Sequence, residues 1–301
     1  MTHTLTTRVW LELTLLALIW GGSFLAIRTA LDEIGFLASV SHRVLWAALV
    51  LWGIALLRGQ TMPRSLRLWG AFLVMGLLNN VLPFSLMAWG QLHIETGLTA
   101  ILNAATAIWG VFVAALVFPD ERLTTRRLTG VLIGFLGVAT AIGLANITKL
   151  DLRSLAQLAV IAGTISYAFA GSWARAQLKD VPPLLSAAGM LTGSTLIMLP
   201  VTFAVEGGLP LALEPRTWGA IAYYSVAATA FAYLLYYRIL AAAGAGNLLL
   251  VTLMIPPVAI LLGAWARDEA LAANAYLGFT LLALGLLILD GRLLRLLRQS
   301  D

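Results

Sequence analysis

The chain is organised into ten apolar stretches of about twenty residues each, joined by short polar linkers. A helix of roughly twenty apolar residues is long enough to cross the hydrocarbon core of a bilayer. The alternating pattern of membrane β-barrels is absent, because runs such as residues 281–289 are apolar on every face. We therefore expect an all-α integral membrane protein with ten transmembrane helices. The expected spans are Val9–Leu31, Phe36–Leu57, Trp69–Trp89, Gly97–Val117, Leu128–Ala145, Leu155–Ala174, Pro183–Val205, Thr217–Leu240, Ala245–Ala266 and Tyr276–Leu294.

The composition indicates that lipid is the solvent for much of the chain. Of the 301 residues, 60% are hydrophobic and 11% are charged, whereas soluble domains carry about 25% charged residues. A soluble protein this apolar could not cover its surface with polar side chains. We therefore expect a multi-pass protein of the inner (plasma) membrane, with no linker long enough to fold as a separate domain.

The positive residues predict how the chain is oriented in the membrane. If the N-terminus is cytoplasmic, 13 of the 19 Lys and Arg residues fall in cytoplasmic segments and 4 in outer segments, with Arg28 and Arg43 inside spans. Cytoplasmic loops of membrane proteins are enriched in Lys and Arg. This bias favours an even number of spans with both termini in the cytoplasm.

Two stretches match at a constant offset of 148 residues, the distance from Asp120 to Asp268. The matched residues are Asp120-Glu121 with Asp268-Glu269, Leu123 with Leu271, Gly130 with Gly278, and Gly137 with Gly285. Each half would hold five spans, and an odd number gives the second half the opposite orientation, as in many secondary transporters. We expect inverted five-helix repeats at residues 1–146 and 150–301, although apolar helices also match one another by chance.

Several short motifs follow one another along the chain. They are Leu18–Phe24 (LIWGGSF), Arg43–Ala48 (RVLWAA), Gly97–Leu102 (GLTAIL), Glu121–Thr124 (ERLT), Ile255–Val258 (IPPV) and Glu269–Leu271 (EAL). In this order they resemble the EamA-type ten-helix exporters of the drug/metabolite transporter superfamily. The resemblance implies export of small metabolites, particularly aromatic amino acids. One departure is Ile108, where the family usually has proline, so we expect the fourth span to be straighter than the ninth.

Polar residues gather near the middle of the third span, where hydrocarbon makes them costly. Asn79 and Asn80 are adjacent, and Pro83 removes the hydrogen bond to the carbonyl group of Asn79, four residues earlier. Pro256 and Pro257 interrupt the ninth span in the same way, and we expect all three prolines to act as hinges. The alternative is a structural kink whose free carbonyl group is satisfied by a neighbouring serine or threonine.

The residues expected to line a substrate site combine these amides with hydroxyl and aromatic side chains. Aromatic rings suit a planar or cationic solute through stacking and cation–π contact, although each ring could also simply pack between helices. The expected substrate-binding residues are Trp20, Ser23, Asn79, Asn80, Phe84, Asn103, Thr106, Trp109, Ser166, Tyr167, Tyr224, Tyr233 and Met254.

Two charged residues inside spans allow more than one interpretation. Arg43 could reach the outer surface or pair with Asp32 or Glu33, and the family resemblance favours an architectural role. Glu12 lies four residues after Arg8, so we expect an ion pair on the helix surface rather than a proton-coupling carboxylate.

The sequence lacks the motifs of several other function classes. It contains no cysteine, no phosphate-binding G-x-x-x-x-G-K-[ST] loop, and no H-E-x-x-H or G-x-S-x-G motif. We therefore expect no cofactor, no metal and no nucleic-acid partner. The expected partners are a small-molecule substrate and membrane lipid, with proton coupling left open and no obligate protein partner indicated. A secondary exporter that works by alternating access through a central cavity is the favoured function. The alternatives are a passive channel, a membrane-embedded sensor and an intramembrane enzyme.

Overall fold

The structure is a computed structural model that describes residues 6–119, 124–142, 152–248 and 250–290. The described residues form helices joined by short linkers, and no strand occurs among them. In chain order the elements are α1 (Thr7–Ala30), α2 (Phe36–Leu57), α3 (Leu66–Gly76), η1 (Leu77–Val81), α4 (Leu82–Gly90), α5 (Thr96–Asn103), α6 (Thr106–Val117), α7 (Thr125–Ile142), α9 (Leu152–Gln177), α10 (Pro183–Glu206), α11 (Pro215–Ala222), η2 (Tyr223–Phe231), α12 (Ala232–Leu248), α13 (Leu250–Arg267) and α14 (Ala273–Asp290).

The expected all-helical architecture is confirmed. Eight helical stretches are long and apolar enough to cross a membrane, judged by length and composition, and they correspond to the first eight expected spans. The end of the fifth expected span, residues 143–145, lies outside the described residues. The ninth and tenth expected spans correspond to two shorter apolar helices, Val251–Arg267 and Ala273–Ile288. The orientation of the two termini stays a prediction. The first Asp-Glu pair of the expected repeat lies outside the described residues.

The start of α2 shows how an acidic residue fixes two helices to each other. The carboxylate of Glu206, at the end of α10, accepts hydrogen bonds from the backbone N–H groups of Leu37 at 3.0 Å and Ala38 at 2.8 Å. A carboxylate at a helix N-terminus satisfies free N–H groups and complements the helix dipole. Gly207 then ends α10 in the left-handed region, with φ of 80°. This contact holds one end of α2 against α10.

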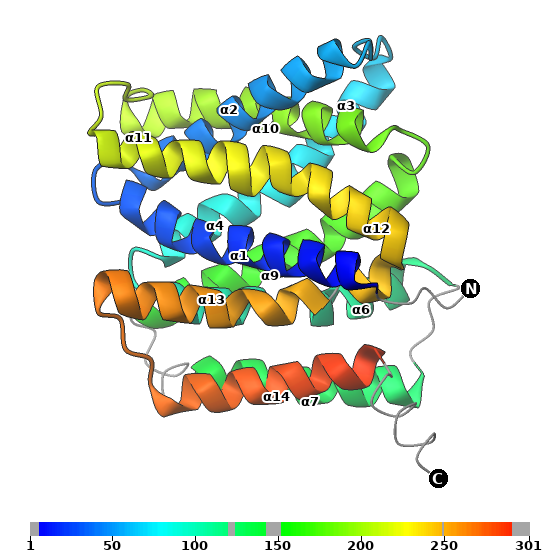
Figure 1. Cartoon of the computed structure of the whole chain (residues 1–301), viewed down its shortest axis with the longest axis vertical. Coiled ribbons are helices and arrows are strands. Elements are labelled where there is room, and N and C mark those ends of the chain that lie inside the picture. The colour runs from blue at the N-terminus through cyan, green and yellow to red at the C-terminus, as the bar shows by residue number, and fades with distance from the viewer. Residues whose placement is uncertain (1–5, 120–123, 143–151, 249, 291–301) are drawn as a thin grey trace.

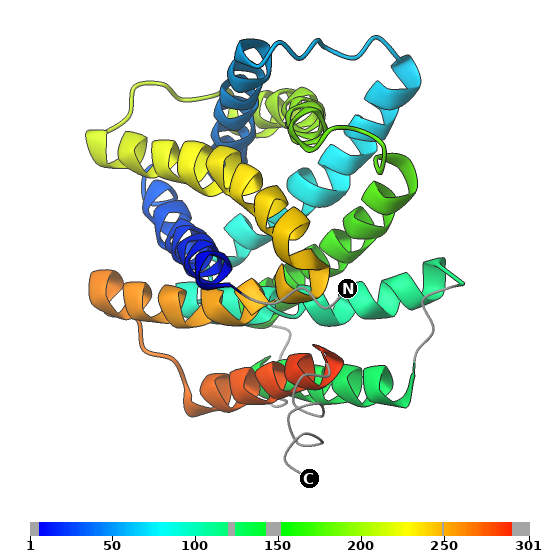
Figure 2. The same ribbon diagram turned by 45° about the vertical axis from the view of Figure 1, so that its right-hand side comes forward.

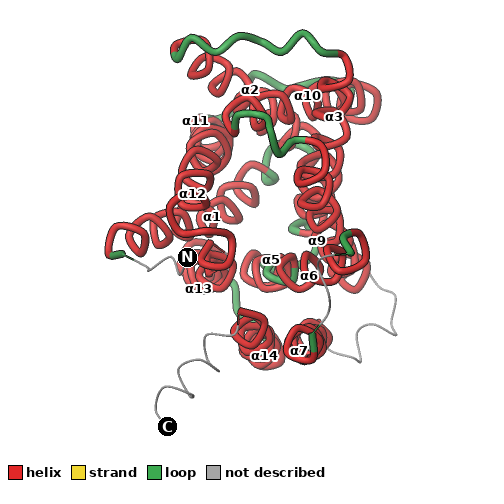
Figure 3. The backbone as a smooth tube through the Cα atoms, turned by 90° about the vertical axis from the view of Figure 1, so that its right-hand side faces the viewer, coloured by secondary structure: helices red, strands yellow, loops and turns green. Residues whose placement is uncertain are grey.

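Most of the helices surround the centre of the molecule, as the view along the bundle shows (Figure 3). Segments far apart in the sequence lie side by side in this arrangement: α1 packs against α13, α2 against α10, and α4 against α9. α7 and α14 pack against each other and form a separate layer beside α13 and α6 (Figure 1; Figure 2).

Glycines bring the backbones of α7 and α14 close together. A Cβ atom added at Gly137 would lie 2.8 Å from the carbonyl oxygen of Gly278, and one added at Gly285 would lie 2.7 Å from that of Gly130. Small residues allow this close approach in many membrane helix pairs. The 148-residue offset relates Gly130 to Gly278 and Gly137 to Gly285. Replacing each glycine of the first contact by its counterpart in the other half therefore gives the second contact.

The fourth span is interrupted, and the expectation that it is straighter than the ninth stays a prediction. α5 ends at Asn103 and α6 begins at Thr106, with two turn residues between them, whereas α13 continues through Pro256 and Pro257. The hydroxyl of Thr106 donates to the carbonyl oxygen of Asn103 at 2.7 Å. Such a local side-chain bond competes with helical hydrogen bonding, so a helix can break without a proline.

The outward faces of the bundle are apolar. Leu15 of α1, Leu132 of α7, and Leu261 and Trp265 of α13 expose 49%, 55%, 69% and 81% of their surface. Exposed apolar area on this scale indicates a surface that is covered in the native environment. This pattern agrees with lipid around a multi-pass membrane protein.

Candidate functional site

Two π-helical segments interrupt the third and eighth spans. η1 covers residues 77–81 and η2 covers residues 223–231. Shifting η1 by the 148-residue offset gives residues 225–229, which lie within η2. A π-helical turn holds an extra residue and often marks a functional site. The two irregular segments therefore occupy corresponding positions in the two halves of the chain.

Pro83 follows η1 and has no backbone N–H to donate. At the end of η1 the backbone N–H of Leu82 donates to the carbonyl oxygen of Leu77, five residues back instead of four. The same spacing places the carbonyl group of Leu78 opposite Pro83. The hydroxyl of Ser166, on α9, donates to the Leu78 oxygen at 2.7 Å. The freed carbonyl group of Asn79 that α-helical spacing predicts stays a prediction. Ser166 thus supplies the structural hydrogen bond that a proline kink requires.

Replacing Ser166 with alanine should lower the free energy of unfolding by about 1 kcal/mol, because it leaves a buried carbonyl group unpaired. Unfolding in mixed detergent micelles would measure the change. Thr195→Ala is the matched control, since the Thr195 hydroxyl bonds only to the Leu191 carbonyl of its own helix, at 2.8 Å. Equal losses in the two variants would contradict the role assigned to Ser166.

An amide cluster in η1 connects three spans. Asn79 donates through Nδ2 to the Tyr233 hydroxyl at 3.1 Å, and that hydroxyl donates to Asn80 Oδ1 at 3.3 Å. Asn80 donates through Nδ2 to Ser194 Oγ at 2.8 Å. Asn80 is fully buried, whereas Asn79 and Tyr233 are only partly buried. Asn80 therefore fixes the helices, while Asn79 and Tyr233 are less completely buried.

Arg43 lies inside the bundle beside this cluster. Its Nε donates to Thr229 Oγ1, on η2, at 2.9 Å, and its guanidinium carbon lies 3.8 Å from the centre of the Phe84 ring. Phe84 meets Tyr167 edge-on, with ring centres 6.5 Å apart. The guanidinium also interacts electrostatically with the phenols of Tyr167 and Tyr233. We call Arg43, Asn79, Phe84, Tyr167 and Tyr233 the central site.

Neither acidic residue considered for Arg43 pairs with it. Asp32 pairs with Arg267 through two hydrogen bonds of 2.8 Å, and the Glu33 carboxylate accepts from the backbone N–H of Glu214 at 3.0 Å. Arg43 is the eighth residue of α2, roughly 10 Å along the helix from its start, and both acidic residues precede that start. The sequence alone does not indicate that its side chain turns towards η2.

Two further hydrogen bonds connect η2 to α1 and to α2. Trp20 donates through Nε1 to the Ala228 carbonyl oxygen at 3.1 Å. Tyr224 is fully buried, and its hydroxyl lies 3.3 Å from the hydroxyl of Ser39. Ser23 donates to the Trp20 carbonyl oxygen of its own helix at 2.6 Å. These polar groups already have protein partners, and their contact with a substrate stays a prediction.

The remaining predicted residues lie apart from the central site. Trp109 packs against Phe135 with ring centres 4.6 Å apart, and Met254 packs in the apolar cluster of α1, α12 and α13. Trp109 Nε1 and Asn103 Oδ1 are buried without a hydrogen-bond partner. Among the described residues, no hydrogen bond or ring contact joins Asn103, Thr106 or Trp109 to the central site.

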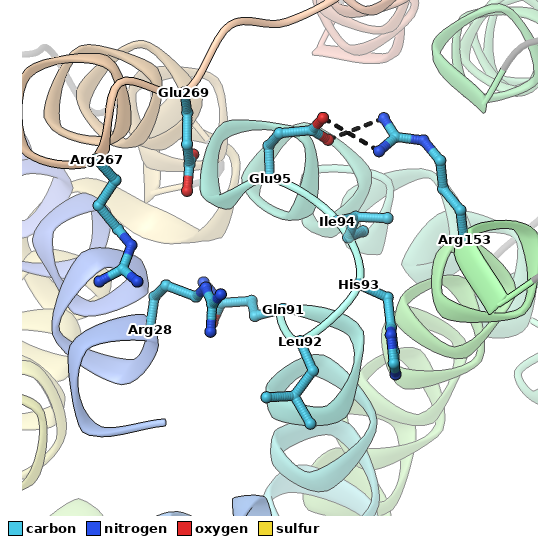
Figure 4. Close-up of a pocket in the computed structure, with 9 residues that line it drawn as sticks. All are labelled: Arg28, Gln91, Leu92, His93, Ile94, Glu95, Arg153, Arg267 and Glu269. Atoms are coloured by element: carbon cyan, nitrogen blue, oxygen red, sulfur yellow. Dashed lines mark hydrogen bonds and ion pairs between the residues drawn. The ribbon is translucent and has the colours of Figure 1, made fainter. Parts of the chain in front are cut away.

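A polar cavity of about 350 Å³ lies at the end of the bundle where α13 ends. Arg28, Arg267 and Glu269 point into one side of it, and Glu95 faces Arg153 on the other side (Figure 4). The Arg153 guanidinium donates to both oxygens of Glu95, at 3.1 and 2.9 Å. On the rim, the Arg267 guanidinium holds the pKa of the Asp32 carboxyl below its usual range, chiefly through their hydrogen bonds. The pair of Asp32 with Arg267 is therefore charged at neutral pH.

A second charged group lies at the opposite end of α1. The Glu12 carboxylate pairs with Arg8 at 3.0 Å and with Arg238 of α12 at 3.1 Å. The expected pair between Arg8 and Glu12 is confirmed. Arg238, which the sequence does not associate with Glu12, extends the pair across two spans.

Comparison with known proteins identifies relatives along the whole chain. A family model described as "EamA-like transporter family" matches residues 10–143 and 154–289. A "Probable terminal-alkyne amino-acid exporter" of Streptantibioticus cattleyicolor is 26% identical over 300 residues, covering 99% of this chain and 98% of that protein. An "Uncharacterized transporter" of Archaeoglobus fulgidus is 25% identical over 291 residues, covering 93% of this chain and 97% of that protein. A solved crystal structure with 15% sequence identity has a TM-score of 0.67, covers 94% of this chain and 97% of its own, and shows a shared fold.

Proposed function

Because the chain belongs to the EamA-like transporter family, we propose that it is a secondary exporter of small metabolites, most of all aromatic amino acids. The relative named as a probable terminal-alkyne amino-acid exporter supports amino acids in general as the substrate class, since it is 26% identical along nearly the whole chain. The proposed location is the inner membrane with both termini in the cytoplasm, as the distribution of Lys and Arg favours.

The central site is the observation that carries the proposal. Asn79 and Phe84 come from the first half of the chain, and Tyr167 and Tyr233 come from the second. Secondary transporters bind their solutes between such halves, near irregular helices. The amide and phenol groups can donate to and accept from polar solute groups, and the rings offer stacking surfaces for a planar side chain.

Alternating access through this site requires that the two ends open in turn. The pair of Asp32 with Arg267 ties the end of α1 to α13 at one end of the bundle, and the pair of Glu12 with Arg238 ties α1 to α12 at the other. Partly exposed ion pairs contribute only about 0–1 kcal/mol each, so they can break and re-form during a transport cycle. We propose that these two pairs close the outer and inner gates.

The proposed inverted repeats at residues 1–146 and 150–301 supply the symmetry that such a cycle uses. Two features support them besides the sequence match. The π-helical segments occupy corresponding positions in the two halves. The two glycine contacts between α7 and α14 are also related to each other by the 148-residue offset.

Counterflow in proteoliposomes tests the proposed function. Vesicles that contain the protein and are loaded with unlabelled phenylalanine or tryptophan receive a trace of the labelled amino acid outside. We expect the label to accumulate transiently above its equilibrium level, because a saturable carrier exchanges internal for external solute. Empty liposomes provide the control. A channel would equilibrate the label without an overshoot, and overshoot with other solutes alone would overturn the aromatic assignment.

A further inference from the structure

The guanidinium of Arg43 is the least satisfied polar group of the central site. An arginine side chain has five N–H donors, and only Nε has a hydrogen-bond partner among the described residues, namely Thr229. No ion pair within the described chain includes Arg43. A cation placed away from water without an anionic partner is costly. The side chain therefore lacks the counter-charge that would justify its position.

The neighbours of the guanidinium provide no negative charge. Phe84 offers a ring face at 3.8 Å, and the nearby phenols of Tyr167, Tyr224 and Tyr233 are neutral groups. Arg43 is partly buried, and among the described residues no hydrogen bond uses its terminal nitrogens. Two fixed contacts, to Thr229 and to the Phe84 ring, orient the guanidinium while its outer N–H groups stay free.

We propose that Arg43 binds the carboxylate of the transported solute and makes the central site selective for monocarboxylates with an apolar or aromatic body. The planar guanidinium matches a carboxylate through two parallel N–H···O bonds. The Phe84 and Tyr167 rings lie beside it, where the apolar part of such a solute would pack. This inference rests on the proposed function and adds the chemical group that the site recognises.

Other arginines of the same chain show what a structural role looks like. Arg153 donates twice to Glu95, and Arg267 donates twice to Asp32. Each of these side chains uses its terminal nitrogens on a permanent protein carboxylate. Arg43 has no such acceptor among the described residues, which favours a carboxylate that comes and goes.

The test compares two probes that share a phenyl ring and differ in charge. Phenylpropionate carries a carboxylate and no ammonium group, and phenethylamine carries an ammonium group and no carboxylate. Binding is measured as ligand-induced thermal stabilisation of the purified full-length protein and as inhibition of phenylalanine counterflow. We expect Arg43→Gln to weaken phenylpropionate binding by about 10- to 100-fold, the value of a charged hydrogen-bond pair, while phenethylamine binding changes little. Arg58→Gln, at an exposed site after α2, should change neither probe.

Thr229→Val provides a second variant that keeps the charge. It removes the Nε contact, so it should weaken phenylpropionate selectively and less strongly than Arg43→Gln does. If Arg43→Gln fails to fold, this variant and the wild-type preference for phenylpropionate carry the test. Equal loss of both probes, or no wild-type preference for the carboxylate, would overturn the inference.

The two proposals fail in different ways. Phenylalanine counterflow with an unchanged ratio of the two probes in Arg43→Gln would leave the exporter proposal standing and overturn the role of Arg43. Arg43-dependent binding of phenylpropionate without counterflow of any amino acid would overturn the proposed function and leave carboxylate recognition standing.

Discussion

Replacing Gly137 with leucine is expected to prevent most of the protein from reaching its folded state. A Cβ atom at this position would lie 2.5 Å from the backbone nitrogen of Leu282 and 2.8 Å from the carbonyl oxygen of Gly278. Backbone atoms cannot rotate away as a side chain can, so α7 and α14 would have to separate. Overpacking costs about 1–3 kcal/mol where neighbours can adjust, and we expect a loss of about 3 kcal/mol or more here. The yield of monodisperse protein and its thermal unfolding in detergent would measure the effect.

Two further glycine variants make the comparison specific. Gly171→Leu adds the same side chain to an exposed face of α9, where no atom lies within 4 Å of the added Cβ, and it should fold normally. Gly285→Leu should behave like Gly137→Leu, because its Cβ would lie 2.7 Å from both the Gly130 oxygen and the Gly134 nitrogen. If Gly137→Leu is as stable as Gly171→Leu, the tight contact between α7 and α14 is not present.

Alanine at Asn79 and at Tyr167 is expected to impair transport while the protein stays folded. Asn79→Ala removes a partly buried amide, and we expect the half-saturation concentration for phenylalanine to rise by about 10-fold. Tyr167→Ala removes a ring beside Phe84 and should raise it by about 10-fold through lost stacking and apolar contact. If the two sites act independently, the double variant should lose about 100-fold. Concentration-dependent counterflow would measure each value.

Tyr276→Ala is the matched aromatic control for this pair. Tyr276 is 48% exposed on α14, in the layer that is separate from the central site, so its loss should leave transport unchanged. Wild-type kinetics in both Asn79→Ala and Tyr167→Ala, with normal folding, would rule out the central site as the place where the solute binds.

The helices could be predicted from the sequence because hydrocarbon leaves the backbone few alternatives. A lipid-exposed apolar segment must satisfy its own N–H and C=O groups, and a helix does so within one segment. The departures from regular helices could not be predicted in the same way. The break after Asn103 depends on the local bond from Thr106, and the π geometry of η1 depends on contacts with other spans, such as the bond from Ser166.

Four residues of the central site could be named from the sequence as candidates, but Arg43 and the contacts among these residues could not. Asn79, Phe84, Tyr167 and Tyr233 stand out in the sequence as polar or aromatic residues deep within spans. Ser194, the partner of Asn80, does not stand out, because small hydroxyl residues are common in membrane helices and usually bond to their own backbone. The environment of Arg43 depends on which face of α2 packs against η2, and its partner Thr229 is 186 residues later in the sequence. The packing of the whole bundle determines that face, and no local sequence pattern indicates it.

The two π-helical segments also determine where the bundle can bend. A regular α-helix is stiff, and kinks concentrate where the hydrogen-bond ladder is irregular, π turns included. η1 has five residues and η2 has nine, so the third span has a short compliant joint and the eighth span a longer one. The two halves thus share the position of their joint but differ in its length. We expect the longer joint to make the eighth span easier to bend than the third, so that the motions that open the two ends of the bundle differ in energy.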